Sequence, residues 1–417
     1  MGHDGGTGKV SLRERRYLRT LAHRMLELAN EPENRAKAEL WYAHNALEGK
    51  RPMIVMETGP FYSEMAPPLA CESEVARRVE SHLAGIVNEH KMVGDDKVVP
   101  DEYQVGMSIW MEGTPVPTKR AADASGRQLG YAQDHPIKDI AADFHKLQPY
   151  KYKYAREHTM QRAEEAFDVI GDILPVRLRN GSLTWAGMVT NPAVSLMGLE
   201  RLLFAMVDDP DGVHRLFSYI TDNVVGFVDW QESEGLLTLN NGNDYAGAGS
   251  YGFTRELPAS GFDGNVRARD MWINANSQES SGISPEMYGE FVYPYTKRIT
   301  DKFGLAYYGC CEPVNSIWEG CLSKMGNLRK VSVSIWCDEE YMGDALRGGR
   351  VIYSRKPSPN HIGVGAFDEA AFRAHIGKTV RAADGCGLEF IYRDVYTLCG
   401  DPEKPRKAVR VMRELTS

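Results

Sequence analysis

The stretch SPEMYGEFVYPYTKRITDKFGLAYYGCCEP, residues 284–313, contains one complete unit of a parallel α/β fold. Ser284 followed by Pro285 is a typical helix start, because serine caps the first turn and proline suits the first helical position. The helix expected over 285–302 leads into a short apolar strand, 305–308. Polar and sulfur-containing side chains follow that strand. The unit predicts that similar helices and strands flank it.

Short apolar strands alternate with helical segments along most of the chain. We expect strands at 52–57, 103–110, 183–189, 235–239, 268–273, 305–308, 331–335, 350–353 and 388–392. We expect helices at 199–206, 210–234, 285–302 and 369–384. This alternation indicates a parallel sheet with crossover helices, and at this chain length it favours a (β/α)8 TIM barrel. Nine strands exceed the eight of such a barrel, so we place 103–110 outside the ring.

Two segments extend or interrupt the predicted barrel. Residues 1–50 are predicted to form an N-terminal helical extension of two helices, preceded by a loose polar tip at 1–8. The barrel is predicted over 51–417, with an insertion at about 112–160 that is rich in Pro, Gly, Asp and His. Long segments without a regular period are commonly functional loops, so we interpret the insertion as a lid over the barrel mouth.

The composition is that of an ordinary globular protein, with 42% hydrophobic and 25% charged residues. The net charge is -8, from 57 acidic and 49 basic residues, which argues against binding to nucleic acid. No apolar run approaches the roughly 18 residues that span a membrane. Seven cysteines without a regular framework indicate reduced thiols, so we expect a cytoplasmic protein.

Polar side chains follow most of the predicted strands at the point where each strand ends. The loops after the strands of a parallel barrel meet at one face, so we predict that these side chains form one site. We assign catalysis to Glu57, Asn241, Asp244, Gln278, Glu279 and Glu312. We assign substrate binding to Trp110, Tyr308, Trp336, Asp338 and Asp394.

Some of these residues also have a purely structural interpretation. Asn241 and Asp244 lie in a glycine-containing turn, where both residue types are favoured for bonding to the local backbone. Gln278 and Glu279 also suit an ordinary helix entry before Ser284. The sequence alone leaves both interpretations open.

Cys310 and Cys311 are adjacent, and Gly309 and Glu312 flank them. Adjacent cysteines after a buried strand are commonly inert small hydrophobic residues. However, thiols beside a carboxylate offer soft and hard metal ligands within one loop. No Cys-x-x-Cys or His-x-x-x-His pair lies in this segment, so a metal needs a distant ligand. Cys399, after the last strand, is the best placed, and we predict a metal site of Cys310, Cys311 and Cys399.

Residues 284–313 resemble the segment of the uroporphyrinogen decarboxylase superfamily in which a helix leads into a strand that ends in a metal-binding His-x-Cys-Gly motif. LERLLFAMVDDPDGVHRL at 199–216 and VSVSIWCD at 331–338 are similar to two other recurrent stretches of that family. Together these stretches cover the C-terminal two-thirds of the chain, whereas residues 1–150 match only loosely. The resemblance implies a uroporphyrinogen decarboxylase-like (β/α)8 barrel.

That family contains tetrapyrrole decarboxylases and corrinoid-dependent methyltransferases. The decarboxylases carry an N-terminal Arg-Gln-Ala-Gly-Arg-Tyr segment, which is replaced here by Met56-Glu57-Thr58-Gly59. The resemblance therefore implies a methyltransferase. Such an enzyme moves a methyl group between a small O- or N-methylated substrate, tetrahydrofolate or a thiol and a corrinoid (cobalamin) on a partner protein.

Two alternatives remain open at this point. The first is a cofactor-independent decarboxylase of a tetrapyrrole or another polycarboxylate, which needs basic residues in its pocket. The available ones are Arg255, Arg267, Arg269 and Arg393. The second is a non-catalytic protein that binds a corrinoid or a folate. Whether the chain forms a homodimer also stays open.

The zinc-dependent methyltransferases of the family bind zinc through the His and Cys of the motif and a Cys near the C-terminus. The resemblance matches these two cysteines to Cys310 and Cys399, whereas Tyr308 stands at the histidine position. The zinc ligand set is incomplete as transferred. Cys311 or Glu312 would have to replace the histidine, or the site holds no zinc.

Overall fold

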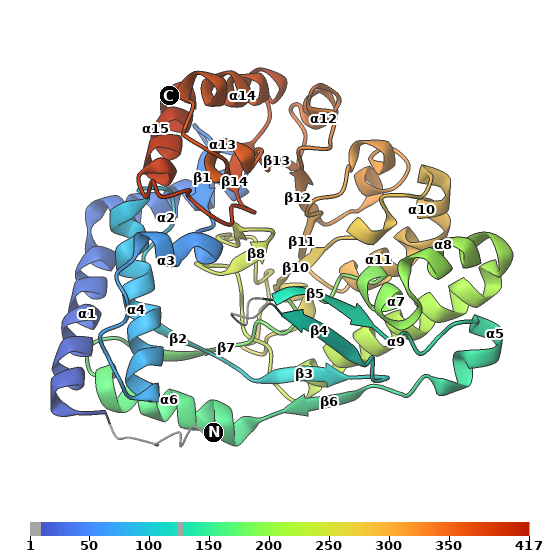
Figure 1. The fold of residues 1–417 in the computed structure, drawn as a ribbon, viewed down its shortest axis with the longest axis horizontal. Coiled ribbons are helices and arrows are strands. Elements are labelled where there is room, and N and C mark those ends of the chain that lie inside the picture. Colours follow the sequence, from blue (N-terminus) through green and yellow to red (C-terminus); the bar gives the residue numbers. More distant parts are fainter. Residues whose placement is uncertain (1–9, 123–127, 417) are drawn as a thin grey trace.

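A computed structural model of the chain describes residues 10–122 and 128–416. Its centre is a six-stranded parallel sheet with the strand order β1-β14-β13-β12-β11-β10 (Figure 1). The strands are β1 (Met53–Met56), β10 (Trp272–Ala275), β11 (Leu305–Tyr308), β12 (Leu328–Val333), β13 (Ile352–Arg355) and β14 (Leu388–Tyr392). Five of the six are buried at every residue, as their continuous apolar runs predict. The predicted α/β class with a parallel sheet is confirmed.

Helices connect the strands of the sheet, and one more helix follows the last strand. They include α10 (Pro285–Phe291), α11 (Tyr293–Thr300), α12 (Glu339–Leu346), α13 (Asn360–Gly363), α14 (Glu369–Ala382) and α15 (Lys404–Thr416). Ser284 caps α10 as predicted, because its hydroxyl accepts a hydrogen bond from the Met287 N–H at 3.2 Å. The single helix expected over 285–302 is interrupted at Val292, because Pro294 lacks the N–H that a continuous helix needs there.

The N-terminal extension forms the two predicted helices, α1 (Leu12–Asn30) and α2 (Pro32–Asn45). Ser11 and Glu14 cap α1 reciprocally, and Pro32 begins α2. In Figure 1, α1 lies beside α4 (Glu74–Met92) and α6 (Arg156–Ile170). The three helices share one buried apolar cluster. The loose tip predicted at 1–8 lies outside the described residues.

The segment predicted as one strand at 103–110 forms two strands, and both lie outside the six-stranded sheet. β2 (Tyr103–Gly106) pairs in parallel with β7 (Val176–Arg179), and β3 (Ile109–Glu112) pairs antiparallel with β6 (Lys151–Tyr154). A further antiparallel pair, β4 (Thr118–Ala122) and β5 (Gln128–Gln133), belongs to the predicted insertion. The insertion therefore contains regular strands, which its composition did not indicate.

Two predicted strands, 183–189 and 235–239, are wrong. Residues 183–189 form turns before α7 (Thr190–Met197), and their apolar side chains Leu183, Ala186 and Val189 are buried there. Residues 235–239 make hydrogen bonds to a side chain instead of a strand ladder. Asn180 donates its amide to the Leu236 carbonyl at 2.8 Å. An apolar run identifies burial but does not specify the strand pairing.

The remaining helices lie between β1 and β10 along the chain. They are α3 (Tyr62–Met65), α5 (Ile140–Asp143), α8 (Leu199–Asp208) and α9 (Pro210–Ser233). The helices predicted at 199–206 and 210–234 are confirmed. Within residues 10–122 and 128–416, no helix is long and apolar enough to cross a membrane.

A short glycine-rich hairpin, β8 (Tyr245–Gly247) and β9 (Ser250–Tyr251), packs against one face of the sheet. A Cβ atom at Gly247 would lie 2.7 Å from the Asn274 Oδ1 on β10. At Gly249, whose φ is +91°, a Cβ atom would lie 2.3 Å from the Ile391 side chain on β14. Only glycine permits this approach of the backbone to both strands. The hairpin thereby reaches the carboxyl end of β1.

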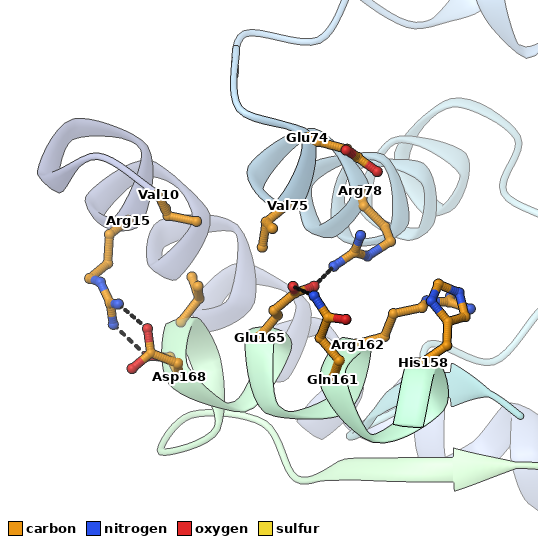
Figure 2. Close-up of a pocket in the computed structure, with 11 residues that line it drawn as sticks. Val10, Arg15, Glu74, Val75, Arg78, His158, Gln161, Arg162, Glu165 and Asp168 are labelled. Carbon is orange, nitrogen blue, oxygen red and sulfur yellow. Dashed lines mark hydrogen bonds and ion pairs between the residues drawn. The ribbon is translucent and has the colours of Figure 1, made fainter. Parts of the chain in front are cut away.

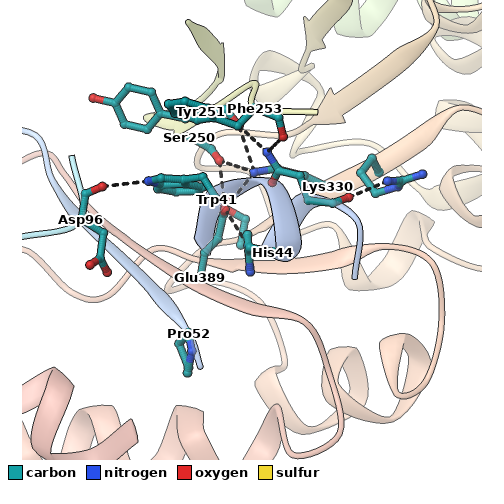
Figure 3. Close-up of polar contacts among 12 residues, drawn as sticks. Trp41, His44, Pro52, Asp96, Ser250, Tyr251, Phe253, Lys330 and Glu389 are labelled. Carbon is teal, nitrogen blue, oxygen red and sulfur yellow. Dashed lines mark hydrogen bonds and ion pairs between the residues drawn. The ribbon is translucent and has the colours of Figure 1, made fainter. Parts of the chain in front are cut away.

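A buried charged network connects α2, the hairpin and two strands of the sheet (Figure 3). Lys330 Nζ on β12 lies 3.0 Å from Glu389 Oε2 on β14. His44 Nε2 lies 3.2 Å from the same oxygen, and the Ser250 hydroxyl donates to it at 2.9 Å. All four residues are almost fully buried. Burial opposes the charge on Glu389, but Lys330 and His44 hold the pKa of this carboxyl well below its ordinary value.

We expect Lys330→Met to destabilise the protein by about 3–5 kcal/mol, because it leaves the Glu389 carboxylate buried without its cation. Urea unfolding at neutral pH measures this loss. The double variant Lys330→Met, Glu389→Leu should recover most of the stability, because removing both partners leaves no unpaired charge. Arg255→Ala, which breaks an exposed ion pair with Glu39, is the matched control. If Lys330→Met unfolds at the same urea concentration as the control, the buried network does not stabilise the fold as proposed.

Candidate active site

The carboxyl ends of β1, β11, β13 and β14 bring together one group of ionisable side chains. Glu57 follows β1, Cys310 follows β11, Lys356 follows β13 and Arg393 follows β14. Arg393 Nε lies 3.3 Å from Glu57 Oε2, and Arg393 and Lys356 both interact electrostatically with Cys310. These strands are parallel, so their ends lie at the same edge of the sheet. We refer to the group formed by Glu57, Cys310, Lys356 and Arg393, together with the neighbouring Cys311, as the thiol site.

The two adjacent cysteines of the thiol site have different ionisation behaviour. Their Sγ atoms are 3.6 Å apart, with Cys310 9% exposed and Cys311 half-buried. A hydrogen bond from the Cys311 thiol lowers the pKa of Cys310, and the positive charges of Arg393 and Lys356 lower it further against the effect of burial. The same hydrogen bond raises the pKa of Cys311. Cys310 is therefore the thiol of the pair that ionises more readily, and the better candidate for a nucleophile.

Arg393 carries N–H groups that are available to a ligand. Its Nε and Nη1 are buried and have no hydrogen-bond partner among the described residues. The neighbouring carboxylates of Glu57 and Asp394 lie 3.3 and 3.6 Å from Nε and balance its charge. Arginine stays protonated at any physiological pH, so these donors persist. An acceptor atom of a substrate would satisfy them.

Lys356 is a buried lysine that sequence reasoning missed. Its Nζ donates to the Tyr307 hydroxyl at 2.6 Å and to the Ser354 hydroxyl at 2.8 Å. Burial lowers the pKa of Lys356 to about 7, and Arg393 contributes in the same direction. An amine that titrates near neutral pH can deliver or accept a proton. A lysine directly after an apolar strand was the available signal, but the predicted strand ended at 353, two residues too early.

Glu312 holds the backbone of the thiol site in place. Its two carboxylate oxygens accept hydrogen bonds from the Ser277 N–H and the Cys310 N–H, both at 2.9 Å. Glu312 thus ties the loop after β10 to the loop after β11. Burial raises its pKa. Its oxygens are occupied by backbone donors, so its geometry is that of a positioning residue rather than a reacting one.

Tyr308, predicted to bind substrate, is completely buried. Its hydroxyl makes hydrogen bonds to the Tyr288 hydroxyl at 2.7 Å and to the Ser277 hydroxyl. Both contacts belong to the packed interior beside Glu312. As the last residue of β11, Tyr308 alternates in direction with Tyr307, whose hydroxyl contacts Lys356. The structure thus places Tyr307 rather than Tyr308 at the thiol site.

Glu279 and Gln278 lie in the turn after β10. The Glu279 carboxylate accepts hydrogen bonds from the Thr190 hydroxyl at 2.7 Å and the Asn191 amide at 3.0 Å, both in the first turn of α7. Its charge also acts on Glu312. Gln278 is exposed. Glu279 therefore lies near the thiol site, but its hydrogen bonds anchor the first turn of α7 and do not involve the thiol site.

Asn241 and Asp244 line a different cleft, with a volume of about 650 Å³. Asp244 Oδ1 lies 3.8 Å from Arg179 Nε, and burial raises the pKa of Asp244. The Asn241 amide donates to the Leu257 carbonyl. The contacts of both residues belong to this cleft and not to the thiol site, because the chain turns back into the β8–β9 hairpin directly after them.

The other predicted residues lie at the surface. Trp110 is 41% exposed, and its indole donates to Glu112 at 2.9 Å. Trp336 is 69% exposed and lies in the loop after β12. Asp338 caps α12 by accepting from the backbone of its first turn. Of this predicted substrate-binding set, Asp394 is the member that borders the thiol site, where its Oδ2 lies 3.9 Å from the Cys311 Sγ.

The predicted zinc ligands do not fit a metal site as they are placed. Cys399 is exposed, and its thiol contacts the Gly363 carbonyl at 3.4 Å. Cys310 and Cys311 supply at most two thiols, whereas a structural or catalytic zinc needs three or four protein ligands. Among residues 10–122 and 128–416, no three His, Cys, Asp or Glu side chains are grouped closely enough to hold a metal ion.

A groove of about 560 Å³ lies between α1, α4 and α6 (Figure 2). Its charged side chains largely pair with each other, as Arg15 does with Asp168 and Arg78 with Glu165. None of the predicted site residues lines it. The groove has no nucleophile, and the thiol site is the better candidate for chemistry.

Comparison with known proteins found no matching family model and no matching curated protein. Among solved structures, one similar chain is a methyltransferase from Methanosarcina mazei. It is 10% identical to this chain, and the alignment covers 91% of this chain and 98% of that chain with a TM-score of 0.49. At this identity the similarity assigns no role to any residue.

The pKa shift of Cys310 predicts rapid alkylation near neutral pH. A lowered pKa means that the reactive thiolate forms at lower pH, and Arg393→Gln should reverse part of that effect by removing a positive charge. Each unit of pKa increase lowers the thiolate fraction about tenfold below the pKa. The rate of iodoacetamide labelling of Cys310, followed by mass spectrometry from pH 5 to 9, measures the midpoint. Labelling of the exposed Cys399 is the internal reference, and an unchanged Cys310 midpoint in Arg393→Gln would show that the cation has no influence.

Proposed function

We propose that this chain is a methyltransferase that acts at the thiol site. The observation that carries the proposal is the Cys310 thiol, whose pKa is lowered, beside the amine of Lys356 and the N–H donors of Arg393 that lack a hydrogen-bond partner among the described residues. Methyl transfer is a displacement at carbon. It needs a nucleophile, a donor group that stabilises the leaving atom, and one proton. The thiol site contains a residue for each of these tasks.

The chemistry of the first transfer follows from these three residues. The Cys310 thiolate attacks the methyl carbon of an O- or N-methylated substrate, and the bond between that carbon and the leaving oxygen or nitrogen breaks. Arg393 donates a hydrogen bond to the leaving atom, and protonated Lys356 supplies the proton that neutralises it. The products are S-methylated Cys310, the demethylated substrate and neutral Lys356. Orientation of the reactants within a buried site would supply much of the acceleration.

A corrinoid on a partner protein is the proposed acceptor. When bound, a corrinoid supplies a cobalt centre that exchanges methyl groups. The loops that follow β12, β13 and β14 carry exposed apolar side chains, Trp336, Val364 and Tyr396, which are 69%, 63% and 74% exposed. Such residues fit contact with a flat apolar group or a protein surface. If the chain is such a methyltransferase, these side chains support docking of the corrinoid protein over the carboxyl ends of the strands.

The arginines distinguish methyl transfer from decarboxylation of a polycarboxylate. A site for several carboxylates needs several cations, but only Arg393 of the four candidate arginines borders the thiol site. Arg255 pairs with Glu39, and Arg267 pairs with Asp263. Arg267 and Arg269 both precede β10, at the opposite end of the strand from its carboxyl terminus. This distribution favours the methyltransferase.

We also propose that the sheet is part of a barrel of the uroporphyrinogen decarboxylase type. The six strands of the sheet, the parallel β2–β7 pair and residues 236–240 would make a ring of nine strands, one more than in a regular (β/α)8 barrel. Asn180, directly after β7, bonds to Leu236 and to Thr238. Asn240 exchanges two hydrogen bonds with the Trp272 backbone of β10.

All seven cysteines are free, which supports a reducing compartment such as the cytoplasm.

The proposed function predicts that the protein methylates free cob(I)alamin from a small methyl donor. Methanol, trimethylamine, a methoxybenzene and methyltetrahydrofolate form a suitable panel, with the absorption spectrum of the corrinoid as readout. Cys310→Ser should lower the rate at least about a hundredfold. Cys386→Ser, which removes a half-buried thiol outside the thiol site, is the matched control. Full activity of Cys310→Ser would exclude the nucleophilic role, and binding without turnover in the native protein would favour a non-catalytic binding protein.

Lys356 predicts a falling rate on the alkaline side of neutrality. The protonated amine is the acid in the proposed transfer, and with a pKa of about 7 it is progressively lost as pH rises through 7. In Lys356→Arg the side chain stays protonated, so the alkaline decline near pH 7 should disappear from the kcat profile. If both proteins show the same profile, Lys356 does not supply the proton.

A further inference from the structure

We propose that Cys310 and Cys311 form a reversible redox modification site, at which a hydroperoxide converts the two adjacent thiols into a disulfide. The two Sγ atoms lie 3.6 Å apart and already share a hydrogen bond. Theirs is the only thiol–thiol contact among the described residues. The proposal depends on this pair alone and holds whatever reaction the thiol site catalyses.

The two thiols differ in the way that stepwise oxidation requires. Cys310 is the thiol with the lowered pKa, and Arg393, which interacts with it electrostatically, can stabilise its thiolate and the charge of a departing oxygen. Thiolates, not thiols, react with peroxides. Cys311 is the protonated and more exposed partner, which suits it to react second. The pair thus resembles a reactive cysteine with its resolving cysteine already in contact.

The oxidation balances with one hydroperoxide. The Cys310 sulfur attacks the peroxide oxygen, the O–O bond breaks, and the leaving oxygen takes up a proton as an alcohol or water. Cys310 is then a sulfenic acid. The Cys311 sulfur attacks the Cys310 sulfur, the S–O bond breaks, and the Cys311 proton leaves with the hydroxyl as water. Two electrons pass from the two sulfurs to the peroxide, and one S–S bond forms.

The adjacency of the residues makes the disulfide easy to reduce. Neighbouring Cα atoms are about 3.8 Å apart across a trans peptide, which is shorter than the usual Cα separation of about 4.4–6.8 Å across a disulfide. A strained disulfide has a more oxidising potential and is readily reduced by thiols. Gly309, with a φ of +98°, precedes the pair and gives the backbone room to adjust.

The disulfide would also disturb the loop that holds the thiol site. The Cys310 N–H donates to Glu312, which in turn accepts from Ser277. A ring of the two cysteines changes the backbone between Gly309 and Glu312, so this connection between the loops after β10 and β11 loosens. Oxidation therefore removes the thiolate and displaces its support at the same time.

The chemistry of the native protein provides the first test. After treatment with a small molar excess of hydrogen peroxide, the proteolytic peptide containing residues 310 and 311 should lose the mass of two hydrogens and resist alkylation. Dithiothreitol should restore the original mass of the peptide and the alkylation of both cysteines. Phenylarsine oxide, which bridges two close thiols, should bind one equivalent before oxidation and none after it. Full alkylation of both cysteines after peroxide, or a disulfide between two chains on a non-reducing gel, would overturn the proposal.

The variants separate the two steps. In Cys311→Ser, Cys310 should stop at the sulfenic acid, which dimedone traps, and phenylarsine oxide should no longer bind. Cys399→Ser removes an exposed thiol without a thiol neighbour and should leave the mass loss unchanged. Direct conversion of Cys310 to the sulfinic acid in the native protein, at the rate seen in Cys311→Ser, would show that Cys311 does not resolve it. These mass readouts do not depend on methyl transfer, so failure of one proposal leaves the other testable.

Discussion

The Glu389 carboxylate lies inside the sheet, where the cost of an unpaired charge is several kcal/mol, and three side chains from different elements converge on it. Lys330 comes from β12, His44 from α2 and Ser250 from the hairpin. This requirement for pairing holds the hairpin against one face of the sheet. Gly249 next to Ser250 then lies against the end of β14 and against Glu57, since a Cβ atom there would meet both. The buried ion pair therefore helps to determine where Glu57 stands relative to Arg393.

The charges of the thiol site follow from one permanent cation. Arg393 cannot lose its proton, so Glu57 and Asp394 lie beside a permanent positive charge and Cys310 gains a stabilising neighbour. Lys356 experiences the opposite effect, because burial disfavours its charged form and the positive charge of Arg393 adds to that penalty. The arginine thus adds to the Cys311 hydrogen bond in lowering the pKa of Cys310, and it adds to burial in lowering the pKa of Lys356.

The sequence identified the type of fold and part of the site, because burial and strand ends leave clear local signals. β1, β11 and β14 were located by their apolar runs, and Glu57, Cys310 and Asp394 were found as the polar residues that follow them. β13 was predicted two residues early, so Lys356 was overlooked. Asn241 and Asp244 were grouped with Cys310 because they follow an apolar run. Their true place depends on a hairpin whose path is determined by close backbone contacts at Gly247 and Gly249, which no local pattern reveals.

The reactivity and the vulnerability of Cys310 have the same physical origin. A thiolate that can attack a methyl carbon can also attack a peroxide oxygen, and the cations that stabilise it do not distinguish between the two electrophiles. Removing Arg393 would protect the thiol only by making it less reactive. Cys311 offers a different solution, because its sulfur is already in contact with Cys310 and can trap the first oxidation product before it reaches an irreversible state. On this argument the hydrogen bond that favours the Cys310 thiolate also provides the route by which that thiol is recovered.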